Sequence, residues 1–358
     1  MRRALELSLR GRGQVSPNPM VGAVLVRDGE VVGEGWHAML GGAHAETAAL
    51  ASAGERARGA TLYVTLEPCV HHGRTPPCVD AIIAAGVARV VCAITDPTPE
   101  AAGGVARLRE AGVEAACGLL AEDAAELNAA FLHGARSALP WVTLKLALSL
   151  DGAIADHTGR PAWLTGPRAR QRVHEMRAAN DGIAVGAGTA LADDPQLTVR
   201  DTQRPRVAPA RVIFDRQLTL PLESSLVRTA RTVPVVVVAD NSSDSARRRA
   251  LEGQGVAVVL ADSHGDALRA LRARGIGSLL VEGGARIAGS LLDAALVHRL
   301  VIFQAPVVLG AGALGGFAHV ASRVADDAPR WRVVGRESLD DDLMTVYALQ
   351  ELDVHRPD

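Results

Sequence analysis

The sequence lacks the features that mark secreted or nucleic-acid-binding proteins. It holds only four cysteines in 358 residues, too few for a disulfide scaffold, and cytosolic thiols more often serve a metal site or catalysis. The formal net charge is −2, so no basic surplus is present to hold a long polyanion. This excludes nucleic acid as the expected main partner.

Long hydrophobic runs are missing as well. The strongest run, residues 233–239, is too short to cross a bilayer and suits a buried parallel strand. Residues 1–13 are basic, but Glu6 and Arg10 interrupt the apolar positions, which favours a helix over a signal peptide. We therefore expect a cytoplasmic protein with no membrane partner, long enough for two domains.

Lysine is almost absent, since the chain has 37 arginines and one lysine, Lys145. A general preference for arginine, such as codon bias, explains the composition, and one lysine can persist by chance. The functional interpretation is that Lys145 stands where arginine cannot serve, because lysine is compact and can lose its proton when buried.

The first part of the chain alternates strands with helices. Residues 21–37 predict a hairpin that turns at Asp28-Gly29. Helices are expected at 41–59, 76–86, 105–112 and 123–136, and strands at 61–68 and 88–95. The rhythm restarts near 138–141, so we expect domains at 1–139 and 140–358, both of the α/β class.

In the second domain, helices again alternate with strands, which predicts a mostly parallel sheet. A long strand is expected at 141–152, a helix at 166–180 and a strand at 181–191. Later strands are expected around 211–215, 234–240, 256–261, 278–284 and 299–310.

Four residues of the first domain suggest a zinc site. His44 and Glu46 open one helix, Cys69 ends a strand and Cys78 starts another helix. One imidazole and two thiolates make a three-ligand zinc set whose fourth position is left for water. Glu46 is then the expected proton carrier. The alternatives are a solvated surface pair, or a closed structural site completed by one of the two histidines at 71–72.

The arrangement HxE…PC…C resembles the fold of zinc-dependent nucleobase and nucleoside deaminases. That fold usually has PCxxC, whereas eight residues separate Cys69 from Cys78. This long insert, with SPNPMVGAVLV and TLEPCVHHGRTPPC, is similar to the pyrimidine deaminase of riboflavin biosynthesis. The resemblance implies a three-layer α/β/α domain with Asn18 and His72 as substrate contacts. Cys92 is expected in the core, and Cys117, which shows no partner motif, is expected to be structural.

Stretches of the second domain resemble the reductase of the same bifunctional family, which is dihydrofolate-reductase-like and uses NADPH. They are LKLALSLDG, ADDPQLTVR and VEGG. On its own, the strand–glycine turn–helix at 278–292 is a weak sign of phosphate binding, because it lacks the GxGxxG fingerprint.

The resemblance transfers roles to matching positions. Lys145 becomes a candidate catalytic residue. Arg177 and Arg200 become candidates for the ribose 5-phosphate, because guanidinium groups suit phosphate oxygens. Pro161 replaces a small hydroxyl residue of the family pattern, and the chain begins later than is usual, which shortens the expected first helix. The other implied substrate contacts are Leu197 and Glu282, and the implied cofactor contacts are Ala147, Trp163, Thr189, Asp193, Arg216, Gly284, Ala285, Arg286, Ile287, Ala288, Gly289 and Ser290.

Taken together, these resemblances imply a homo-oligomeric bifunctional enzyme with Zn²⁺ and NADPH as cofactors. Its expected small-molecule substrate is 2,5-diamino-6-ribosylamino-4(3H)-pyrimidinone 5′-phosphate. The alternatives are another zinc deaminase with an appended reductase-like domain, a dihydrofolate reductase with a decayed deaminase domain, and a non-catalytic zinc-stabilised binding protein.

Overall fold

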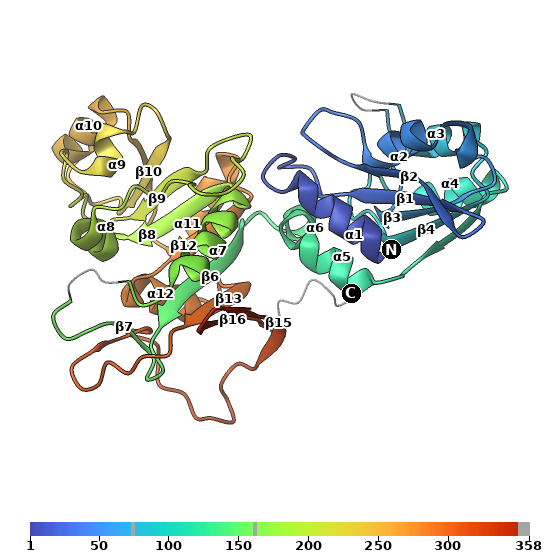
Figure 1. The fold of residues 1–358 in the computed structure, drawn as a ribbon. Coiled ribbons are helices and arrows are strands. Elements are labelled where there is room, and N and C mark those ends of the chain that lie inside the picture. The colour runs from blue at the N-terminus through green and yellow to red at the C-terminus, as the bar shows by residue number, and fades with distance from the viewer. Residues whose placement is uncertain (73–75, 160–162, 350–358) are drawn as a thin grey trace. The chain divides into compact units, whose positions relative to one another are not determined.

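A computed structural model describes residues 1–72, 76–159 and 163–349. Pro161 lies outside the described residues. The chain forms two compact units, one from Met1 to Arg136 and one that begins at Ser137 (Figure 1). Among the described residues, no helix is both long and apolar enough to cross a membrane.

The first unit is built on a five-stranded sheet in the order β2-β1-β3-β4-β5. β1 runs antiparallel to β2 and β3, while β3, β4 and β5 are parallel. The expected hairpin is confirmed, with Asp28 and Gly29 at φ 52° and 83°, the left-handed values of a tight hairpin turn. The strands are β1 (Gly22–Arg27), β2 (Glu30–Trp36), β3 (Thr61–Leu66), β4 (Arg89–Ile94) and β5 (Glu114–Cys117).

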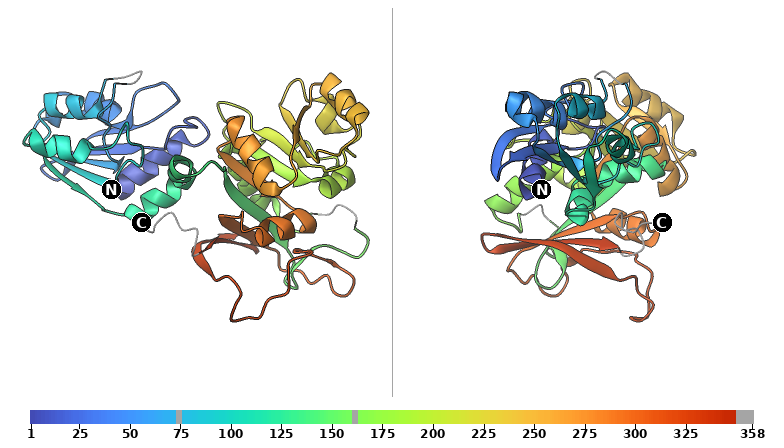
Figure 2. Two further views of the ribbon diagram at one scale, coloured as in Figure 1. Left: turned by 180° about the vertical axis from the view of Figure 1, so that it is seen from behind. Right: turned by 90° about the vertical axis from the view of Figure 1, so that its right-hand side faces the viewer.

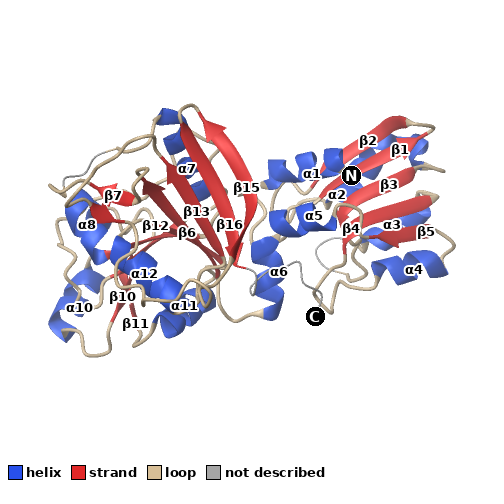
Figure 3. Ribbon diagram, turned by 90° about the horizontal axis from the view of Figure 1, so that it is seen from below, coloured by secondary structure: helices blue, strands red, loops and turns tan. Residues whose placement is uncertain are grey.

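Helices cover both faces of this sheet, which makes the predicted three-layer α/β/α domain (Figure 3). α2, α3 and α4 pack on one face, and α1 and α5 on the other. The helix expected at 123–136 is interrupted at Asn128, whose side chain bonds the backbone N–H and carbonyl of Met20 at 2.8 and 3.0 Å. The helices are α1 (Arg2–Ser8), α2 (Ala45–Ala53), α3 (Cys78–Ala84), α4 (Gly104–Glu110), α5 (Ala121–Leu127) and α6 (Ala129–Arg136).

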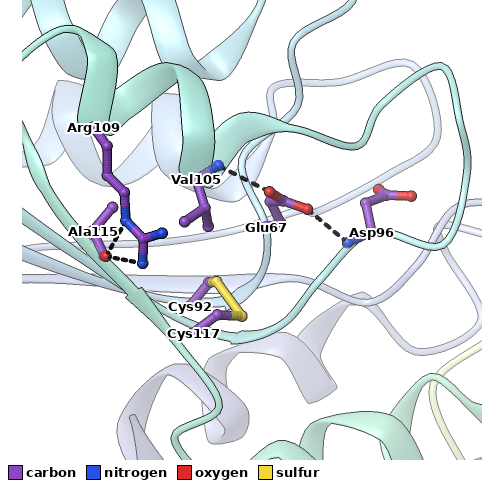
Figure 4. The surroundings of a disulfide bond; sticks show 7 residues. All are labelled: Glu67, Cys92, Asp96, Val105, Arg109, Ala115 and Cys117. Carbon is purple, nitrogen blue, oxygen red and sulfur yellow. Dashed lines mark hydrogen bonds between the residues drawn. A yellow bond between two sulfur atoms is a disulfide. The ribbon is translucent and has the colours of Figure 1, made fainter. Parts of the chain in front are cut away.

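Cys92 and Cys117 form a disulfide between β4 and β5 (Figure 4). Cys92 is fully buried, as expected, and Cys117 has a structural role, although no sequence motif indicated its partner. The two residues are register partners in neighbouring parallel strands. The sequence hid this pair because the four residues of β5 were not recognised as a strand.

The second unit contains a nine-stranded sheet in the order β11-β10-β9-β8-β12-β6-β13-β16-β15. Its first seven strands are parallel, and β16 and β15 continue it as an antiparallel hairpin (Figure 2). β14 and β7 form a separate two-stranded sheet. The strands are β6 (Trp141–Leu148), β7 (Ala153–Ala155), β8 (Gly182–Gly186), β9 (Ala210–Phe214), β10 (Val235–Ala239), β11 (Ala257–Leu260), β12 (Ser278–Glu282), β13 (Arg299–Gln304), β14 (Leu314–Gly315), β15 (Trp331–Leu339) and β16 (Asp342–Leu349).

Side chains alternate between two hydrophobic cores, one on each face of the large sheet. In β10, Val236 and Val238 join the core under α11 and α12, while Val235 and Val237 join the core on the face of α9 and α10. α7 packs on that second face against Val301 and Phe303. The helices are α7 (Pro167–Ala178), α8 (Ala187–Asp193), α9 (Ser225–Arg228), α10 (Ser245–Gly253), α11 (His264–Ala273) and α12 (Ala285–Asp293).

One boundary in the second unit differs from the prediction. The strand expected at 181–191 ends at Gly186, and the remaining residues form α8. Gly186 is the extended N-cap of that helix. The segment that follows, AGTAL, contains good helix formers, which explains the switch.

Candidate functional site

Three side chains from separate elements of the first unit meet in one cluster. His44 is the N-cap of α2, Cys69 follows β3 and Cys78 opens α3. The His44 Nδ1 lies 3.2 Å from Cys78 Sγ and 3.6 Å from Cys69 Sγ. All three candidate ligand atoms lie within 4.8 Å of one another. The structure therefore brings together the three residues that the sequence predicted as zinc ligands.

The chemistry of this donor set fits zinc. The Cys78 thiol and His44 lower the pKa of Cys69 to about 4, while the pKa of Cys78 is raised, because the two buried sulfurs share one proton. A divalent cation replaces that shared proton and accepts both thiolates. Zn–S and Zn–N bonds of about 2.3 and 2.0 Å are compatible with ligand atoms this close.

Glu46 lies beside the cluster, two residues after His44. Its side chain is buried, with 4% exposed. Burial raises the pKa of the carboxyl group to about 7. A group with such a pKa exchanges protons readily near neutral pH, which is what a proton carrier requires.

A histidine that the sequence did not single out holds Asn18. The amide Nδ2 of Asn18 donates to His37 Nε2 at 3.3 Å, and His37 Nδ1 donates to the carbonyl of Ala43 at 3.0 Å. The His37 ring also meets the His44 ring edge to face at 5.6 Å between centroids. These contacts place Asn18 near the cluster. His72, by contrast, is exposed.

Glu67, next to the Pro68-Cys69 pair, anchors the segment after β4. Its two carboxylate oxygens accept the backbone N–H groups of Asp96 at 3.1 Å and Val105 at 2.9 Å (Figure 4). The anchored segment places Ala101 against Cys69 and Cys78. No sequence pattern pointed to Glu67, because both of its partners are backbone groups.

The second unit holds a cavity of about 680 Å³ on the α7 face of its sheet. Four cationic side chains and two carboxylates line it, which suits an anionic ligand. The lining includes the predicted Ala147 and Trp163, and the guanidinium of Arg170 lies 5.2 Å from the Trp163 ring centroid. The charged lining residues are Lys145, Arg170, Arg177, Arg200, Asp201 and Glu282.

Lys145 and Glu282 are register partners in β6 and β12 and lie on the same face. Burial lowers the pKa of Lys145, and Glu282 counteracts this in part. Arg177 binds Glu282 through two hydrogen bonds of 2.5 and 2.7 Å and donates to the carbonyl of Thr198 at 3.0 Å. Because these partners occupy the Arg177 fork, the exposed Arg200 is the better candidate for a substrate phosphate.

The predicted cofactor turn is built as a tight glycine turn. Gly283 and Gly284 have φ of 64° and 81°, and a Cβ on Gly284 would lie 2.9 Å from Thr189 Oγ1. This turn leads into the first backbone N–H groups of α12, which have no acceptor within the helix and suit a phosphate-bearing cofactor. Ile287 and Ala288 point into the core, and Gly289 packs on the carbonyl of Ala318.

The remaining predicted contacts differ in their exposure and in their position relative to the cavity. Arg216 is 71% exposed, with Nε bonded to Asp240 at 2.8 Å. His264, which the sequence did not indicate, bonds Ser290 Oγ at 3.1 Å. Leu197 is buried in the core, and Asp193 ends α8 outside the cavity lining.

Comparison with known proteins agrees with the division of the chain into two units. Residues 1–94 match the cytidine and deoxycytidylate deaminase zinc-binding region, and residues 140–345 match the RibD C-terminal domain. The riboflavin biosynthesis protein RibD of Haemophilus influenzae is 41% identical over 97% of this chain and 96% of that protein. The chain belongs to the RibD family. The Escherichia coli RibD is 42% identical over 93% of this chain and 94% of its own length.

Two solved structures align with nearly the full length of this chain. A diaminohydroxyphosphoribosylaminopyrimidine deaminase/5-amino-6-(5-phosphoribosylamino)uracil reductase from Thermotoga maritima aligns with a TM-score of 0.85 at 38% identity, covering 98% of this chain and 97% of its own. Acinetobacter baumannii RibD aligns with a TM-score of 0.84 at 37% identity, with the same coverage.

These RibD relationships establish a bifunctional deaminase and reductase of riboflavin biosynthesis. Zn²⁺ serves the deaminase domain, and NADPH serves the reductase domain. The alternatives of another deaminase with an appended domain and of a non-catalytic zinc protein are not favoured.

Proposed function

We propose that the first unit deaminates 2,5-diamino-6-ribosylamino-4(3H)-pyrimidinone 5′-phosphate and that the second reduces the product. The observation that carries the first step is the meeting of His44, Cys69 and Cys78 beside the buried Glu46. Three ligands leave one position for water, which a hydrolytic reaction needs.

In the deaminase, His44, Cys69 and Cys78 hold zinc, which when bound lowers the pKa of water. The water oxygen bonds to the ring carbon that carries the 2-amino group, while Glu46 accepts a proton from that water. Glu46 delivers this proton to the ring nitrogen that the addition makes basic, and it then carries the second proton, from the new hydroxyl group, to the departing amino nitrogen. The C–N bond breaks, a carbonyl forms and ammonia leaves. Asn18 and His72 are proposed to orient the substrate.

In the reductase, the cavity holds the ribosyl group of the product and Arg200 binds its 5-phosphate. NADPH, when bound, would supply the hydride for C1′, and the bond between C1′ and the ring oxygen breaks as the sugar opens to ribityl. Lys145 donates the proton that the released ring oxygen takes up to become a hydroxyl group, and Glu282, fixed by Arg177, positions the sugar. The Gly284–Ser290 turn, Thr189, Ala147, Trp163, Asp193 and Arg216 are proposed to contact the cofactor.

The decisive experiment follows ammonia release and NADPH oxidation separately with the zinc-loaded protein. Glu46→Gln should lower ammonia release by about 10²–10⁴-fold, because the proton carrier is lost. Reduction of supplied deaminated substrate should continue. Glu55→Gln, an exposed glutamate just after α2, is the matched control. Ammonia release that survives in Glu46→Gln would contradict the assigned role.

The assembly and location form part of the proposal. We propose a cytoplasmic homo-oligomer, supported by the resemblance to the RibD family. Analytical ultracentrifugation at several protein concentrations tests the assembly, and a concentration-independent monomer would contradict it.

A further inference from the structure

A strained segment, residues 194–201, contributes Arg200 and Asp201 to the lining of the reductase cavity. Asp194, Leu197 and Asp201 have φ of 38°, 49° and 55°, in the left-handed region that non-glycine residues rarely adopt. Such backbone persists only where the surroundings fix it, and it concentrates at functional sites. The same segment carries Arg200, whose side chain lines the cavity.

Contacts from α7 hold this segment in place. Arg177 Nη1 donates to the carbonyl of Thr198 at 3.0 Å. One turn earlier on α7, His174 Nδ1 accepts the backbone N–H of Arg200 at 3.2 Å. The buried Leu197 side chain fixes the segment from the core side. His174 therefore fixes the backbone of Arg200, the residue whose guanidinium lines the cavity.

The protonation state of His174 suits this role. A ring nitrogen that accepts an N–H must carry a lone pair, so the hydrogen of the neutral ring is on Nε2. Burial, Arg177 and Arg200 lower the pKa of His174, while Glu282 and Asp201 act in the opposite direction. His174 itself lines the cavity.

We propose that His174 is a positioning residue of the reductase, which fixes the backbone of Arg200 and so places its guanidinium for the phosphate of the substrate. This rests on the proposed function, in which the cavity binds the phosphorylated sugar. The role belongs to Nδ1 alone. Any side chain that places a hydrogen-bond acceptor at the position of Nδ1 should therefore be able to replace His174.

The test uses His174→Leu and His174→Asn in the full-length, zinc-loaded protein. His174→Leu removes the acceptor and should raise KM for the phosphorylated reductase substrate about tenfold, with little change in kcat. An asparagine side chain would place an amide oxygen where Nδ1 was, so His174→Asn should restore KM to within about threefold. His157→Leu, an exposed histidine, is the matched control.

Two further comparisons separate positioning from general damage. KM for the dephosphorylated substrate should not change in His174→Leu, because only the phosphate meets Arg200. Arg200→Met should raise KM for the phosphorylated substrate, and adding His174→Leu should raise it no further, since coupled residues are not additive. Should His174→Leu fail to fold, His174→Gln, whose acceptor lies one bond further out, replaces it.

The outcomes distinguish the inference from the function beneath it. An unchanged KM in His174→Leu, together with a raised KM in Arg200→Met, would overturn the positioning role alone. Equal losses for phosphorylated and dephosphorylated substrates would overturn it too. An unchanged KM in Arg200→Met would remove the proposed phosphate site as well.

Discussion

Lys145 occupies a place in which arginine would not serve. Its Nζ lies 5.4 Å from the centroid of the Phe303 ring, and its register partner is Glu282. Arg177 already takes the bidentate position on Glu282. A guanidinium at this position would keep its proton and would find the Glu282 carboxylate already bonded to Arg177. The one lysine of the chain thus lies on the wall of the reductase cavity, which supports the functional interpretation.

A pH dependence follows at the same scale. Because the pKa of Lys145 is lowered from 10.5, the amine loses its proton at a pH below that value. If Lys145 donates a proton, kcat for NADPH oxidation should fall as the pH rises through the lowered pKa. The measurement is a pH–rate profile with deaminated substrate. The kcat of Lys145→Met for NADPH oxidation should be low at every pH, and ammonia release by this variant should stay normal.

A flat alkaline profile in the unmodified protein would contradict the proton-donor role. Lys145→Arg adds a second check, since a permanent cation should keep binding the substrate but give a rate lower by about 10²-fold. Full NADPH oxidation by Lys145→Arg would mean that a positive charge at this position is sufficient and that Lys145 is not the proton donor.

Some of the site could be found from the sequence, and some could not. His44, Glu46, Cys69 and Cys78 stand out because zinc demands certain residue types at certain spacings. The residues that the sequence missed act through backbone groups or a single amide, so their identities carry no signature. Their partners are also separated from them along the chain, and only the fold brings them together. These residues are His37, Glu67 and His174.

At the scale of elements, the segment between β4 and α4 supports the zinc cluster. Gly104, the first residue of α4, packs so closely on the end of β3 that an added Cβ would lie 1.9 Å from the carbonyl oxygen of Pro68. Glu67 holds both ends of the segment through Asp96 and Val105. The position of Cys69 therefore depends on an element that carries no ligand.

Gly104→Ala should loosen the metal site. The new methyl group forces α4 away from Pro68, at a cost of about 1–3 kcal/mol, as for other overpacked sites. Zinc release to a chromophoric chelator should become faster, and the unfolding midpoint of the first unit should fall. Gly253→Ala, in α10, meets nothing within 4 Å and is the matched control. Unchanged zinc release in Gly104→Ala would show that this contact does not support the cluster.

The type of an element could be predicted where its hydrophobic periodicity extends over many residues. The boundaries of the elements could not be predicted in the same way. The alternation of the first hairpin and the buried valines of β10 mark strands plainly. The end of β8 at Gly186 depends on a glycine that serves as the N-cap of α8, and glycine alone does not distinguish a strand from a cap. The break at Asn128 depends on Met20, which the local sequence cannot reveal.

At the scale of the whole molecule, each unit has its own hydrophobic core. The three proposed zinc ligands, His44, Cys69 and Cys78, all belong to the first unit. Metal removal should therefore destabilise one unit without the other, because binding free energy adds only to the unit that holds the ion. Differential scanning calorimetry should show two transitions, of which only one shifts when a chelator is added.

NADPH provides the complementary measurement. It should raise the other transition, in the presence and in the absence of chelator, by mass action on the folded reductase unit. A chelator that lowers both transitions together would show that the two cores do not unfold separately.

The register of β6 and β12 also bears on how this reductase site can be transplanted. Lys145 and Glu282 face each other because the hydrogen-bonded ladder aligns them. A slip of one residue would turn the carboxylate to the opposite face of the sheet. A designer who copies the two side chains onto another scaffold must copy the alignment of two parallel strands with them. The pairing of Lys145 with Glu282 therefore depends on the hydrogen bonds between the two strands. A mutation that shifts either strand would remove the function of both side chains at once.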